Sequence, residues 1–135
     1  MGKEDIFLVN RAQETAQYYL GKKINNIKIK TSDTAFKIIR LGEENIKIIK
    51  TPGHTPGSVC FYAKESGLLF TGDTIFANGV GDTSHQYSSK NDLQKSIDKI
   101  LKFDDNLKVL AGHGEEISLI LLKKLFLQNF VSYQA

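Results

Sequence analysis

Three side chains in this sequence have the chemistry of metal ligands and lie among glycines. They are His54 in TPGHTPGS, Asp73 in FTGDTIF and His113 in AGHGEE. Neutral imidazole and carboxylate are standard zinc ligands, and a carboxylate can also bridge two metal ions. One histidine or aspartate beside a glycine is usually a plain loop residue. Three such motifs, each directly after a strand-like segment, predict a common site.

The segments that precede these three residues are predicted strands. Residues 45–50, 68–72 and 107–112 are rich in apolar and β-branched residues. In layered α/β folds the carboxyl ends of such strands gather at one edge of the sheet, where sites tend to form. Flanking glycines allow the backbone to turn sharply or to approach a ligand closely. We therefore expect the three side chains to meet at one edge.

Further elements complete an α/β layer arrangement in one domain, residues 1–135. Period-two patterns predict strands at 27–30, 36–40 and 58–63. Helices are predicted at 9–20, where Gly21 ends the helix, and at 117–130. Another helix is predicted to begin after Ser88 or Ser89 and to carry an apolar stripe. The stripe consists of Leu93, Ile97, Ile100 and Leu101. Residues 73–89 predict a long, glycine-rich loop of the kind that often carries function.

Composition narrows the class of protein. The 135 residues carry a net charge of +3, spread over single lysines, so no nucleic-acid partner is expected. No apolar run reaches the length of a membrane span, and no signal peptide is found, so a cytoplasmic protein without a membrane partner is expected. The single cysteine, Cys60, lies in the apolar segment VCFY and is interpreted as a buried structural thiol.

The motifs PGHTPGS, TGDT and GHG, in this order, resemble the second half of the metallo-β-lactamase superfamily over residues 35–130. The nearest branch is the glyoxalase II-like (hydroxyacylglutathione hydrolase-like) one. The resemblance implies part of an αββα sandwich, with His54 on a first zinc, Asp73 bridging both metals as the catalytic carboxylate, and His113 on a second zinc. It also implies that a metal-bound hydroxide attacks an ester- or thioester-type carbonyl of a small molecule.

The sequence departs from the family in two places. The H-x-H-x-D-H motif that normally comes first is absent, and no histidine precedes His54. We therefore expect a partial zinc site, which holds one or two ions only when another chain completes it. The family segment G-R-x-D reads Gly81-Asp82-Thr83-Ser84 here, which puts its supporting contacts in question. His85 follows, and is interpreted as a loop residue rather than an adventitious ligand.

A half-sandwich would leave a sheet face or edge bare, and bare faces drive association. The expected partner is accordingly a second copy of the chain or a separate amino-terminal polypeptide. Two alternatives stay open. One is a non-catalytic, truncated half-domain that acts in assembly or has no function. The other is a module that binds an anionic small molecule with the glycine-rich loop at 78–82.

Overall fold

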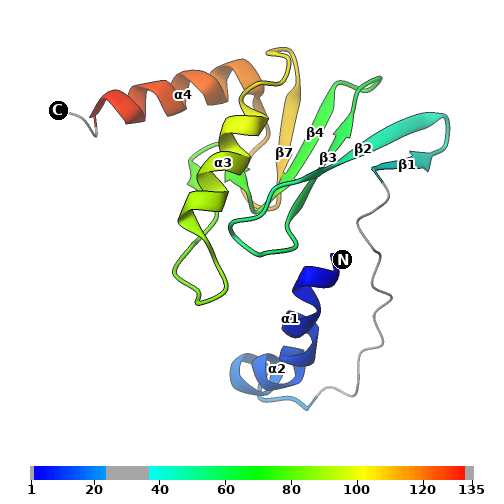
Figure 1. Ribbon diagram of the computed structural model, residues 1–135, viewed down its shortest axis with the longest axis vertical. Coiled ribbons are helices and arrows are strands. Elements are labelled where there is room, and N and C mark those ends of the chain that lie inside the picture. The colour runs from blue at the N-terminus through cyan, green and yellow to red at the C-terminus, as the bar shows by residue number, and fades with distance from the viewer. Residues whose placement is uncertain (1, 24–36, 133–135) are drawn as a thin grey trace.

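The computed structural model describes residues 2–23 and 37–132, and its centre is a six-stranded sheet (Figure 1). The strand order is β1-β2-β3-β4-β7-β8. These strands are β1 (Ile38–Leu41), β2 (Glu44–Lys50), β3 (Val59–Ala63), β4 (Leu68–Gly72), β7 (Lys108–Ala111) and β8 (Ile117–Ser118). All neighbours are antiparallel except β4 and β7. Consequently β2, β4 and β7 run in one direction and end at the same edge.

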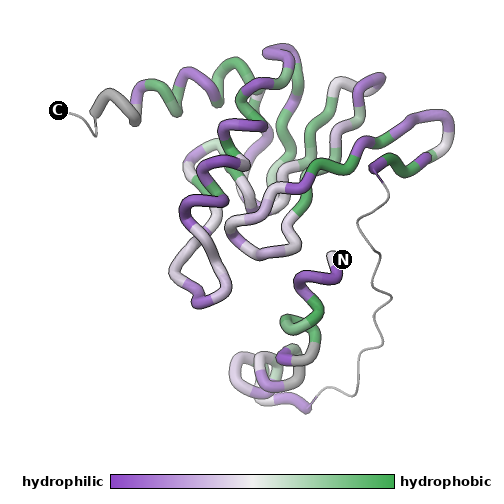
Figure 2. Tube along the Cα trace, viewed as in Figure 1, coloured by the Kyte–Doolittle hydropathy of each residue, from purple (hydrophilic) through white to green (hydrophobic). Residues whose placement is uncertain are grey.

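Two helices, α3 (Lys90–Ile100) and α4 (Leu119–Ser132), supply the apolar side chains that cover one face of the sheet. Polar and apolar residues alternate along both helices (Figure 2). The core cluster consists of Ile49, Cys60, Leu69, Ile75, Leu93, Ile97, Ile100, Leu107, Val109, Leu119 and Leu122, all buried. This burial is the main source of the free energy that holds the strand ends in place.

The opposite face of the sheet also carries apolar residues. Ile48 pairs with Phe61, Phe61 with Phe70, and Phe70 with Leu110, which forms one row across four strands. Because side chains alternate along a strand, this row points away from the core residues Cys60, Leu69 and Val109. None of the four residues is fully buried, and Phe70 is 37% exposed.

The amino-terminal residues form a short 3-10 helix, η1 (Lys3–Asp5), followed by α1 (Ile6–Asn10) and α2 (Ala12–Leu20). They lie near the loop between β2 and β3 (Figure 1). A helix was predicted at 9–20, but the helical segment begins earlier and is broken at Arg11. Gly21 closes it in the left-handed conformation, as predicted.

The remaining predictions are mostly confirmed. The strands at 45–50, 58–63, 68–72 and 107–112 form, and the Ser89 hydroxyl caps α3 by accepting a hydrogen bond from the amide of Asp92. The segment 36–40 contributes to β1, while the predicted strand at 27–30 lies outside the described residues. None of the helices in the described part of the chain is long and apolar enough to cross a bilayer.

Two predictions of secondary structure were wrong, one on where the last helix begins and one on the segment 73–89. Ile117 and Ser118 pair with β7 as β8, so the last helix begins at Leu119 and not at 117. The segment 73–89 is not wholly irregular, because β5 (Ile75–Phe76) and β6 (Gly79–Val80) form a small hairpin. In both cases pairing with a distant or neighbouring strand overrides the local pattern.

Candidate functional site

The three predicted ligands meet at the edge where β2, β4 and β7 end. His54 Nε2 lies 3.8 Å from Asp73 Oδ2, and His113 Nε2 lies 3.5 Å from Asp73 Oδ1. Each histidine thus faces a different oxygen of one carboxylate. Both distances are longer than an ordinary hydrogen bond. They are close to the roughly 3.4 Å that separates two ligands bound about 2.1 Å from one tetrahedral ion.

His54 is held in a defined orientation. Its Nδ1 lies 2.8 Å from the carbonyl oxygen of Asp82. A carbonyl only accepts, so Nδ1 donates this hydrogen bond, and in the neutral ring Nε2 presents its lone pair towards Asp73. A backbone carbonyl on the distal nitrogen is the usual way in which a protein orients a metal-binding histidine.

His113 is held much less. Its side chain is 80% exposed, against 22% for His54 and 38% for Asp73. Besides Asp73, the ring of Phe76 lies near it, with ring centroids 6.2 Å apart. The two histidines therefore differ in their surroundings, because His54 is mostly buried and hydrogen-bonded at Nδ1, whereas His113 is open to solvent.

Two glycines give Asp73 and His54 the room that they occupy. A Cβ on Gly112 would lie 2.3 Å from Asp73 Oδ1. A Cβ on Gly81 would lie 2.0 Å from the carbonyl oxygen of Asp73 and 2.9 Å from the Cβ of His54. Real side chains essentially never come so close, so both positions are restricted to glycine as long as the site keeps this geometry.

Beneath the site, a buried polar network joins the segments that carry His54 and Asp73. The Thr74 hydroxyl donates to Thr51 Oγ1 at 3.2 Å, and the Cys60 thiol lies within 3.4–3.7 Å of both hydroxyls. Thr71 donates its own hydroxyl to the carbonyl of Ile75. All four side chains are essentially inaccessible to solvent. Burial raises the pKa of the Cys60 thiol, which supports its interpretation as a structural residue.

Hydrogen bonds from α3 and from the two residues before it hold the loop that contains His54. The Ser88 hydroxyl donates to the carbonyl of His54, the Ser89 amide to the carbonyl of Gly53, and the Ser96 hydroxyl to the carbonyl of Pro52. The carbonyls of Pro52, Gly53 and His54 therefore all accept hydrogen bonds from α3 or from the two residues directly before it. This leaves the His54 backbone little freedom to move.

The Gly81–Ser84 segment forms a local turn in place of the contacts expected from the family pattern. Both the hydroxyl and the amide of Ser84 donate to the Asp82 carboxylate, and these bonds lower the pKa of Asp82. His85 lies on the same loop, half exposed, and stacks on the ring of Tyr87. Its ring centroid is 6.4 Å from that of His54.

The structure thus brings His54, Asp73 and His113 together in pairs around one carboxylate. Within residues 2–23 and 37–132, no three His, Cys, Asp or Glu side chains converge on a single point. Sequence reasoning missed Asp5, which is buried and hydrogen-bonded to the loop after His54. The only local signal is an acidic residue ahead of an apolar helix, which does not point to a contact 50 residues away.

The chain is similar to known proteins over most of its length. The family model described as metallo-beta-lactamase superfamily matches residues 3–113. Hydroxyacylglutathione hydrolase GloC of Haemophilus influenzae is 34% identical over 117 residues, which are 83% of this chain and 54% of that protein. The probable metallo-hydrolase YqgX of Bacillus subtilis is 35% identical over 83 residues, 61% of this chain and 39% of that protein. The chain therefore spans about half or less of the length of these curated relatives.

A solved structure agrees with the fold. TTHA1623, crystallised in a di-iron-bound form, superposes with a TM-score of 0.77 at 26% sequence identity. The superposition covers 92% of this chain and 61% of that one. The sheet and its helices correspond to part of a longer metal-binding protein.

Proposed function

The chain belongs to the metallo-β-lactamase superfamily, and from that premise we propose that it carries one part of a zinc-dependent hydrolase centre. In this proposal His54 is a ligand of one zinc, Asp73 bridges two, and His113 is a ligand of the other. The observation that carries the proposal is the placement of the two Nε2 atoms opposite different oxygens of Asp73, at 3.8 and 3.5 Å.

The donor set fits zinc. Two imidazole nitrogens and a two-oxygen carboxylate are zinc ligands by type, and His54 already has its proton on the nitrogen that faces away from Asp73. An oxygen of Asp73 occupies the space that a side chain at Gly112 would take. This is the position expected for a carboxylate that lies between the rings of His54 and His113. When bound, zinc supplies an activated water and polarises the substrate carbonyl.

The residues of this chain would position that chemistry. The Asp73 carboxyl lies between the two rings, and the Asp82 carbonyl keeps His54 turned towards it. The substrate class proposed is a small molecule with an ester- or thioester-type carbonyl, in line with the hydroxyacylglutathione hydrolase relative. The glyoxalase II-like assignment rests on that likeness, and on the motifs PGHTPGS, TGDT and GHG.

We propose that further ligands come from a partner, either a second copy of this chain or a separate amino-terminal polypeptide. The row Ile48–Phe61–Phe70–Leu110 supports a partner, because it presents apolar side chains on the sheet face away from α3 and α4. Sedimentation at micromolar concentration tests this: a dimer or larger species is expected, and a stable monomer would count against a second copy.

The alternative is a half-domain without catalysis, acting only in assembly or without function. It is favoured by one observation, that no three potential ligands converge in the described residues. The test is hydrolysis of a panel of thioesters and esters by the purified chain with added zinc. If a second copy completes the site, the hydrolase proposal predicts turnover that chelation abolishes and that Asp73→Asn lowers roughly a hundredfold or more. Turnover that is absent although zinc is bound would favour the alternative.

A further inference from the structure

Asp5 connects the amino-terminal segment to the loop that carries His54. Its side chain is only 7% exposed. Oδ1 accepts a hydrogen bond from the amide of Gly57, and Oδ2 accepts one from the hydroxyl of Thr55, both at 2.7 Å. Thr55 directly follows His54, so both bonds of this carboxylate are made to the loop that holds the metal-ligand candidate.

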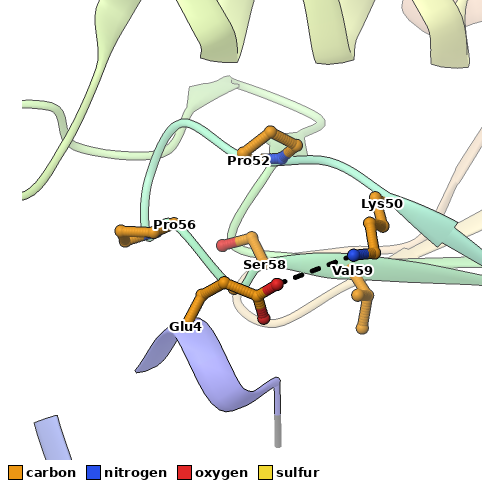
Figure 3. Close-up of a pocket in the computed structure, with 7 residues that line it drawn as sticks. Glu4, Lys50, Pro52, Pro56, Ser58 and Val59 are labelled. Atoms are coloured by element: carbon orange, nitrogen blue, oxygen red, sulfur yellow. Dashed lines mark ion pairs between the residues drawn. The ribbon is translucent and has the colours of Figure 1, made fainter. Parts of the chain in front are cut away.

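The two segments are in close contact. A Cβ on Gly57 would lie 2.7 Å from the Asp5 carboxyl carbon, and a Cβ on Gly2 would lie 2.9 Å from the Gly57 carbonyl oxygen. Figure 3 shows Glu4 extending from the amino-terminal helix over Ser58 to Lys50, with the two charges 3.6 Å apart. The ion pair is partly exposed, whereas the carboxylate of Asp5 is shielded from water.

The same segment touches a second loop beside His54. The ring of Phe7 packs edge-on against Tyr87, with centroids 5.2 Å apart, and Tyr87 stacks on His85. This loop also contains Asp82, whose carbonyl accepts a hydrogen bond from His54 Nδ1. The amino-terminal segment thus supports both the loop that carries His54 and the loop that orients its ring.

We propose that Asp5 is a positioning residue for His54, a statement that rests on the proposed role of His54 as a zinc ligand. Asp5 fixes the Thr55–Gly57 turn by accepting a hydrogen bond from the buried amide of Gly57 and a second one from the Thr55 hydroxyl. A fixed turn keeps Nε2 of His54 at its place opposite Asp73, so that zinc binds without first ordering the loop. Preorganisation of this kind raises affinity because less freedom is lost on binding.

Two substitutions separate hydrogen bonding from mere bulk at this position. Asp5→Asn keeps an oxygen for the Gly57 amide and offers an amide to the Thr55 hydroxyl, which can turn towards Ser58 Oγ, 2.7 Å away. Asp5→Leu has a similar shape but makes neither bond. Glu4→Gln serves as the matched control, because it removes the neighbouring ion pair and leaves Asp5 intact.

The experiment measures amide hydrogen exchange by NMR and zinc affinity by calorimetry, on the 135-residue chain and these variants. We expect exchange at Gly57 to become at least about tenfold faster in Asp5→Leu, with exchange in β3, β4 and β7 unchanged, and zinc affinity to fall about tenfold or more. Asp5→Asn and Glu4→Gln should stay close to the parent chain in both measurements. Thr55→Val, which removes one of the two bonds, replaces Asp5→Leu should the latter fail to fold.

Two results would overturn the proposal. One is unchanged exchange at Gly57 in Asp5→Leu, and the other is an equal loss of protection throughout the sheet, which would make Asp5 a residue of global stability only. Failure of the proposed function looks different. The parent chain would then take up no zinc, while the exchange measurement would still decide whether Asp5 orders the loop.

Discussion

Gly112 leaves the space of a side chain to the carboxylate of Asp73, since a Cβ there would lie 2.3 Å from Oδ1. The relationship links the end of β7 to the turn after β4, because the position of the Asp73 carboxylate requires a glycine at residue 112.

Substitution of Gly112 should therefore damage the site more than the fold. Gly112→Ala forces the Asp73 side chain to rotate away from His113, so zinc affinity is expected to fall by about tenfold or more, measured by calorimetry. Gly79→Ala is the matched control, because a Cβ there meets nothing within 4 Å. Equal zinc affinity in the two variants would show that Asp73 does not need its present position.

The orientation of His54 gives a prediction for the chain without metal. Because Nδ1 lies 2.8 Å from the carbonyl oxygen of Asp82, the neutral ring should carry its proton on Nδ1. His113 is 80% exposed and should show no comparable fixed form. Long-range proton–nitrogen NMR correlations distinguish the two tautomers. A proton found on Nε2 of His54 would contradict the orientation described here.

The buried threonine network should contribute measurably to stability. Thr74→Val removes the donor to Thr51 and an acceptor for the Cys60 thiol. We expect a loss of about 1–2 kcal/mol in the free energy of unfolding by urea. Thr74→Ser keeps the hydroxyl and should recover most of this loss. Identical midpoints for the valine and serine variants would mean that packing of the methyl group matters and the hydrogen bonds do not.

Cys60 should make stability fall at alkaline pH. Burial raises the pKa of its thiol, so the unfolded chain releases this proton at a lower pH than the folded chain. The stability that the neutral thiol contributes is complete below about pH 8.5, and is lost as pH rises towards the higher pKa of the folded state. Urea unfolding from pH 7 to 10 should show a shallower alkaline decline in Cys60→Ala than in the parent chain. Parallel curves would argue against a shifted thiol.

Local patterns in the sequence were sufficient to predict the elements that hold the site. The strand before His54 and the strand before Asp73 follow the β-rich patterns of 45–50 and 68–72. The cap of α3 was predicted as Ser88 or Ser89, and the structure has Ser89. The meeting of His54, Asp73 and His113 at one edge followed from the common direction of strands that end at these motifs.

The features that were missed depend on contacts between distant residues. β8 forms because Ile117 pairs with Val109 of β7. The apolar residues that follow Ser118 carry no sequence signal for the change from strand to helix. Asp5 binds a turn 50 residues away, and its own surroundings in the sequence read as an ordinary helix start. The Asp82 carbonyl that orients His54 is a backbone atom, so no residue type could reveal it.

The central claim is that His54, Asp73 and His113 together bind metal, and native mass spectrometry of the purified chain with and without zinc tests it most directly. This measurement reports bound metal and subunit number in one spectrum. The expected result is an assembled species with stoichiometric zinc, which is lost in His54→Ala and in His113→Ala. A metal-free species whose mass and subunit number do not change when zinc is added would contradict it.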